Sequence, residues 1–93
     1  MTEAQKLVIL KKDLQLTTAV NDEYLATLLS FAAAAVQREG IFIKRGDIEC
    51  EMAVIHYAAY LFRRRAGMDT AMPRFLRYEL NNLLFSQKGS GGS

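Results

Sequence analysis

The residue types that most often bind metals or react covalently are scarce in this chain. It has one histidine, His56, and one cysteine, Cys50. A structural zinc site needs four histidine, cysteine or carboxylate ligands, so paired histidines or thiolates cannot supply one here. Asp47 and Glu51 are spaced one helical turn apart and could share a cation, but acidic residues at a helix start ordinarily complement the helix dipole. We expect no metal and no cofactor.

Residues arranged for catalysis are equally scarce. Along its own helix, the nearest partners of His56 are Glu49 and Tyr60. Cys50 has no histidine within one turn, and its position on a packed helix face predicts a buried, unreactive thiol. The glycine- and serine-rich run 89–93 follows the last expected helix, whereas a phosphate-binding loop precedes one. We therefore expect that this protein is not an enzyme.

Arginine is the chemically distinctive residue that is concentrated in one part of the chain. Residues 1–59 carry six basic and eight acidic side chains, and residues 60–93 carry six basic and two acidic ones. The later arginines are Arg63, Arg64, Arg65, Arg74 and Arg77. A cationic C-terminal third suits an anionic partner, either protein or nucleic acid. The alternative is a solvated helix end whose cations complement the helix dipole.

Length and composition set the class of protein. A chain of 93 residues forms one domain, and a hydrophobic content of 51% excludes disorder for most of it. A domain this small buries only about 60–65% of its unfolded surface, so apolar side chains remain outside and suggest a partner. A lone cysteine favours a reducing, intracellular setting. We expect no signal peptide, because Met1 is not followed by an apolar segment, and the apolar run 52–62 is too short to cross a bilayer.

The hydrophobic pattern predicts an all-α fold, a compact bundle of about four helices without a sheet. The first helix spans 3–12, behind a capping box formed by Thr2 and Gln5. Its expected inward residues are Ala4, Leu7, Val8 and Leu10. The second helix begins at Asn21, which we expect to act as its amide cap, and ends at Gly40.

The third helix, 48–66, is expected to be the long central one. Asp47 caps it and Gly67 ends it. Its apolar residues form two nearly opposite stripes, which predicts neighbours on both sides. One stripe holds Ile48, Met52, Ile55, Ala59 and Phe62, and the other holds Cys50, Val54, Tyr57 and Leu61. The preceding run 41–43 is apolar and short, and a brief extended segment would suit it.

The fourth helix, 73–85, starts at Pro73, a residue that suits the first helical position. Its leucines at 76, 80, 83 and 84 share one side and belong to the core. Arg74, Arg77 and Asn81 form a polar stripe on the far side, with Tyr78 and Phe85 beside it. Arginine and aromatic residues are typical of binding surfaces, so this side predicts an interface. The alternative is that both rings fold over the domain's own edge.

DNA is another conceivable partner of this helix. The third helix, a turn and the fourth helix could form a helix-turn-helix in which Arg74, Arg77 and Asn81 read bases. The turn 67–72 is longer than the usual three or four residues, Glu79 is acidic, and the total charge of +2 is low. A small helical DNA-binding protein of the helix-turn-helix kind is therefore the alternative function.

The order of segments resembles that of a known family. After a short first helix, NDEYL at 21–25 opens an alanine-rich helix that ends in REG at 38–40. A long apolar helix finishes YAAYLFRRR at 57–65, and the last segment reads MPRFLRYELNNLLFS at 72–86. Over residues 3–88 this is similar to the small head–tail connector (adaptor) proteins of tailed bacteriophages and prophages.

The resemblance implies a structural virion protein that assembles into a homo-oligomeric ring of about twelve copies. Such a protein is found in the host cytoplasm during assembly, and its ring lies in the virion neck, docked under the portal protein after DNA packaging. It continues the DNA channel, with only non-specific contact to DNA and none to a membrane, and presents a surface to a stopper or the next connector protein. The family has no catalytic or cofactor residues.

On this reading, residues 1–88 form a single helical connector domain. Residues 89–93 form a flexible Gly/Ser tail or an engineered linker, although relatives often use a C-terminal extension to reach the portal. From their placement, we assign to protein interfaces Arg63, Arg64, Arg65, Arg74, Arg77, Tyr78, Asn81 and Phe85.

Overall fold

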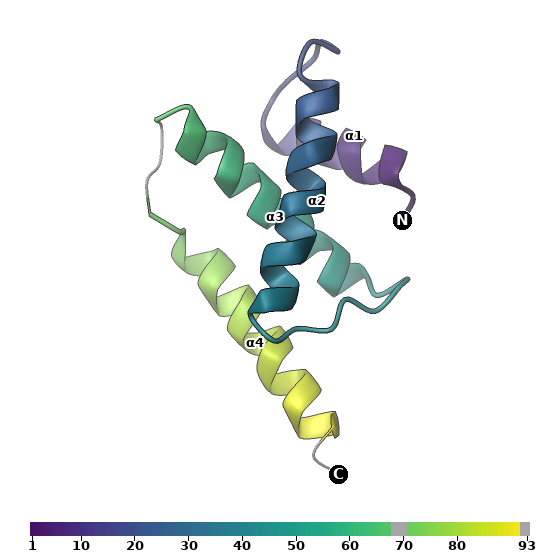
Figure 1. The fold of residues 1–93 in the computed structure, drawn as a ribbon, viewed down its shortest axis with the longest axis vertical. Helices are drawn as coiled ribbons and strands as arrows, with labels where there is room; N and C mark the ends of the chain where they lie inside the picture. The colour runs from purple at the N-terminus through teal and green to yellow at the C-terminus, as the bar shows by residue number, and fades with distance from the viewer. Residues whose placement is uncertain (68–70, 92–93) are drawn as a thin grey trace.

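The computed structural model describes residues 1–67 and 71–91 and is all-helical over these ranges (Figure 1). The four helices are α1 (Glu3–Asp13), α2 (Asp22–Arg38), α3 (Ile48–Arg65) and α4 (Arg74–Gly91). The expected all-α bundle with a long third helix is confirmed.

The starts of α1 and α3 follow the local capping chemistry, whereas that of α2 does not. At α1 the Gln5 amide donates to Thr2 Oγ1 over 3.1 Å, and the Thr2 amide donates to Gln5 Oε1 over 2.8 Å, so the predicted capping box is present. At α3 the carboxylate of Asp47 accepts from the backbone amide of Glu49 over 3.0 Å. Asn21 makes no side-chain cap bond to α2, and that prediction was wrong.

Helix α3 lies at the centre of the core and packs against α1, α2 and α4. Its two-sided burial is confirmed by Val54 and Ile55, which are both buried. Ile48 is exposed instead, although Cys50 and Glu51 in the same first turn are buried. On α4, the leucines at 76, 80 and 83 are buried and the one at 84 packs partly against the core, as predicted.

Helix α1 uses a narrower buried face than its sequence indicated. Leu10 is fully buried and Leu7 is partly buried, but Ala4 and Val8 are exposed. Val8 stands two positions before Leu10, which on an α-helix is nearly the opposite face. Once Leu10 is directed at the core, Val8 must point outward.

Helix α4 differs most from expectation in its length. The carbonyl of Pro73 accepts from the amides of Leu76 and Arg77, so the helix starts one residue later, and it runs to Gly91 instead of Phe85. Helical backbone thus includes residues 89–91 of the expected Gly/Ser tail, and 92–93 lie outside the described residues. In Figure 1 the last turns of α4 extend past the ends of the other helices.

The run 41–43 joins α2 to α3 without forming a strand. Ile41 is buried, and Gly40 before it has φ +98°, a conformation that glycine adopts without strain. The side-chain amide of Gln87 bonds both backbone groups of Phe42: its Oε1 accepts from the Phe42 N–H over 2.7 Å, and its Nε2 donates to the Phe42 C=O over 2.6 Å. These two bonds attach the far part of α4 to the α2–α3 loop.

Candidate functional site

The lone histidine is paired with a residue of another helix. His56 Nδ1 lies 2.8 Å from Glu79 Oε1, and the imidazole meets the Phe75 ring edge-on at 5.4 Å between centroids. The pair therefore links α3 to α4. Neither Glu49 nor Tyr60, the nearest candidates on its own helix, takes this role.

The lone cysteine is buried. Cys50 is fully enclosed, and its thiol lies 3.7 Å from the carbonyl of Phe42. Burial raises the pKa of the Cys50 thiol, because the thiolate would lose its hydration. The expected buried thiol is confirmed, and its protonated form makes it a poor nucleophile at neutral pH.

The two carboxylates that could have shared a cation have different partners. Glu51 is buried, and its two oxygens lie 3.1 and 3.2 Å from the amino group of Met1. Asp47 instead caps α3 through the backbone amides. Over the ranges 1–67 and 71–91, no three histidine, cysteine or acidic side chains gather as metal ligands.

Two of the arginines assigned to interfaces have partners within the chain. Arg63 donates to the backbone carbonyl of Asp13 over 3.1 Å and to its carboxylate over 3.3 Å. Arg77 donates to Glu39 Oε1 over 3.0 Å. Arg77 thus has a carboxylate partner within the chain, because the C-terminus of α2 brings Glu39 beside α4.

The other arginines lie at the surface. Arg64 and Arg74 are exposed, and the guanidinium of Arg65 stacks over the Tyr24 ring at 4.9 Å from its centroid. Arg64 and Arg65 border a hollow between α2 and α3. Asn81, of the predicted polar stripe, is half-buried.

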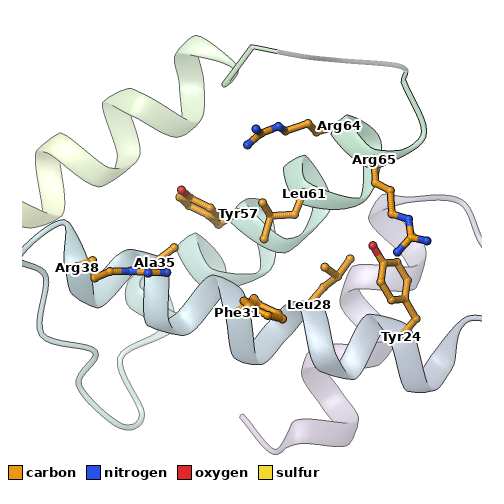
Figure 2. A pocket seen from close by; sticks show the side chains of 9 residues that line it. All are labelled: Tyr24, Leu28, Phe31, Ala35, Arg38, Tyr57, Leu61, Arg64 and Arg65. Carbon is orange, nitrogen blue, oxygen red and sulfur yellow. The ribbon is translucent and has the colours of Figure 1, made fainter.

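This hollow, which we call the arginine groove, has a volume of about 450 Å³ and is shown in Figure 2. It is lined by Tyr24, Leu28, Phe31, Ala35, Arg38, Tyr57, Leu61, Arg64 and Arg65. Phe31 is 60% exposed, so an apolar ring faces solvent there. In Figure 2, Arg38 lies toward one end and Arg65 toward the other, with Arg64 on the α3 side. The groove thus combines an apolar floor with a cationic rim.

Sequence reasoning missed this groove. It placed Tyr57 and Leu61 in an apolar stripe of the third helix and gave no role to Phe31 or Arg38. Each helix by itself gives only an apolar stripe with an arginine near its end. The groove arises where α2 and α3 pack together, so the pattern of one helix carried no signal for it.

The outer face of α4 carries a line of exposed aromatic rings. Phe75, Tyr78 and Phe85 are 55%, 66% and 74% exposed. With the exposed Asn82 they are spaced i, i+3, i+7 and i+10, which places them along one helix face. We call these four residues the aromatic stripe. Tyr78 and Phe85 do not fold over the domain's own edge, and Phe75 is a member that sequence reasoning missed.

A second hollow, of about 520 Å³, lies between the aromatic stripe and the start of α3. Its lining includes Phe75 and Tyr78 together with the carboxyl-bearing Glu49 and Glu79. The stripe is therefore bordered on this side by two acidic residues, in contrast to the cationic rim of the arginine groove.

Comparisons with known proteins identify no relative of this chain. The chain matches no family model, no curated protein and no solved structure. None of the helices, over the residues that the structure describes, is long and apolar enough to cross a membrane.

Proposed function

We propose that this protein is a structural subunit of the head–tail connector (adaptor) type, which self-associates into a ring under a phage portal, continues the DNA channel and joins head to tail. The observation that carries the proposal is the aromatic stripe of α4. Three large rings, each more than half exposed, stand in line on one face of a helix whose opposite face holds the core leucines.

An exposed aromatic line of this kind suits a protein partner. Tyrosine, tryptophan and arginine are enriched among the residues that contribute most of the binding energy of protein interfaces, and an aromatic ring buries a large area with few rotatable bonds. Helix α4 also extends beyond the other helices (Figure 1), which makes its outer face accessible to a neighbouring molecule. The segment resemblance over residues 3–88 adds the family expectation to this physical argument.

A DNA-binding helix-turn-helix receives less support. Of the three residues that would read bases, Arg77 is paired with Glu39 and Asn81 is half-buried. Glu79 places a carboxylate on the same helix, and α3 and α4 run in opposite directions (Figure 1). A recognition helix instead projects several free polar side chains into the major groove.

The test replaces Tyr78 and Phe85 together with serine. We expect wild-type protein to associate in a concentration-dependent way by analytical ultracentrifugation, and the double variant to associate much more weakly with the same helical content by circular dichroism. Val8→Ser, which removes an apolar side chain of α1 that is 52% exposed, is the matched control and should associate like wild type.

The measurement also separates the two candidate functions. An apolar subunit contact should persist as salt rises, whereas DNA affinity falls steeply with salt because phosphate contacts release counterions. A wild-type protein that stays monomeric at millimolar concentration and binds a short duplex with steep salt dependence would overturn the connector proposal.

A further inference from the structure

We infer that the aromatic stripe of one copy docks in the arginine groove of a second copy, so that the subunits join head to tail. This inference rests on the proposed function and names the two surfaces that its self-association would use. It commits to a second copy of this chain as the occupant of the groove.

The first argument is one of shape. An amphipathic helix binds a hydrophobic groove through anchors at i, i+3 and i+7, which fit between two parallel ridges of side chains. On α4, Phe75 and Tyr78 occupy positions i and i+3, the polar Asn82 occupies i+7, and Phe85 at i+10 adds a third ring on the same helix face. The arginine groove runs between α2 and α3, and the largely exposed ring of Phe31 is part of its lining.

The second argument is charge complementarity. Three guanidinium groups, of Arg38, Arg64 and Arg65, border the groove. The hollow beside the aromatic stripe is bordered by the exposed carboxylate of Glu49 and by the half-buried carboxylate of Glu79, which also contacts His56. Opposite charges at the rims of two apolar surfaces direct their approach and fix the register of the contact.

The third argument concerns the symmetry of the contact. The groove is formed by α2 and α3 and the stripe by the outer face of α4, so the two surfaces share no residue. A contact between two different surfaces leaves one groove and one stripe free on every pair. Such heterologous contacts continue from copy to copy and either close into a ring or extend as a filament.

The experiment blocks each surface separately. Phe31→Lys places a cation and removes a ring in the groove, and Tyr78→Lys does the same in the stripe. Val8→Lys, on exposed α1 outside both surfaces, is the matched control. Each variant is checked for helical content by circular dichroism and measured by native mass spectrometry and sedimentation over a concentration series. Arg64→Glu is a second groove variant that keeps all apolar contacts and changes only the rim charge.

We expect wild type and Val8→Lys to form dimers and longer species, and each blocked variant to associate at least about tenfold more weakly, as for a central interface residue. The decisive sample is an equal mixture of Phe31→Lys and Tyr78→Lys. Each retains the surface that the other has lost, so the mixture should form a one-to-one heterodimer, which is recognised by its mass. No assembly larger than this dimer should form.

The other outcomes distinguish this inference from the proposed function. If wild type associates and both Phe31→Lys and Arg64→Glu associate equally well, the groove is not the docking site, but the assembly proposal stands. The same holds if the mixture of blocked variants remains monomeric. If wild type is monomeric at millimolar concentration, both proposals are overturned.

Discussion

At the scale of single residues, polar side chains in this protein mainly connect one helix to another. His56 joins α3 to Glu79 of α4, Arg77 joins α4 to Glu39 at the end of α2, and Glu51 holds the amino group of Met1. By residue type and spacing in the sequence, these residues were candidates for catalysis, metal binding or contacts to DNA bases. Their contacts instead indicate that they set how the helices pack.

The thiol of Cys50 gives a prediction about reactivity. Because burial raises its pKa above the ordinary value of 9.0, native Cys50 should react slowly with a thiol reagent at pH 8, and rapidly once urea unfolds the chain. Absorbance of the released chromophore from an aromatic disulfide measures both rates. Fast labelling of the native protein would show that the thiol is accessible.

The same shift predicts a pH dependence of stability. A group whose pKa is raised in the folded state binds its proton more tightly there, so its contribution is fully present below the unfolded pKa and is lost as pH rises through the folded pKa. The free energy of unfolding should therefore fall above about pH 9 more steeply for wild type than for Cys50→Ala. Urea titrations between pH 7 and 10 measure the difference between the two slopes.

Substitution of the two arginines of α4 should have different effects on the free energy of unfolding. Arg77→Gln removes a partly exposed ion pair with Glu39 and should lower the free energy of unfolding by about 0–1 kcal/mol. Arg74→Gln should leave it unchanged, because that side chain is exposed near a helix N-terminus, where a cation is disfavoured. Urea unfolding of the two variants and of Glu39→Gln tests this. A loss above 2 kcal/mol for either arginine would contradict the assignment.

At the scale of elements, α4 has two faces with different energetic roles. Leu80 is almost fully buried, whereas Phe85 on the opposite side is largely exposed. Leu80→Ala should lower the free energy of unfolding by about 2–5 kcal/mol, through lost burial and a residual cavity. Phe85→Ala should change it by less than about 0.5 kcal/mol, as for a surface substitution.

Chemical unfolding of the two variants at low protein concentration, where subunits do not associate, measures both values. Comparable losses would mean that the Phe85 ring belongs to the core. A large loss for Leu80→Ala alone would leave Phe85 available for a partner.

At the scale of the whole molecule, the domain should keep its stability without a metal. Asp47 and Glu51, the two carboxylates that could have shared a cation, each have another partner: Asp47 caps α3, and Glu51 bonds the amino group of Met1. Thermal unfolding followed by circular dichroism should give the same midpoint with and without a chelator. A fall of several degrees on chelation would show a bound metal that contributes to folding.

Much of the fold could be read from short-range patterns. The capping box of Thr2 and Gln5, the cap at Asp47 and the glycine at position 40 act within a few residues, so their sequence positions predict the helix limits. The leucine spacing of α4 likewise predicts which face is buried. Tyr78 and Phe85 were correctly placed off that face, because the position of a residue around a helix follows from its number alone.

The sequence alone thus determined the helices, their order and most of their inward faces. Only the tertiary structure decided which side chains of different helices contact one another and where a groove forms between helices. The partners of His56 and Arg77, and the groove that brings Phe31 between three arginines, depend on the rotation and crossing of whole helices. That arrangement is set by the packing of the whole core. Val8 of α1, for example, points outward because Leu10 is the residue of that helix that is fully buried. Contacts between residues 23 or 38 positions apart follow from this global packing and from no local pattern.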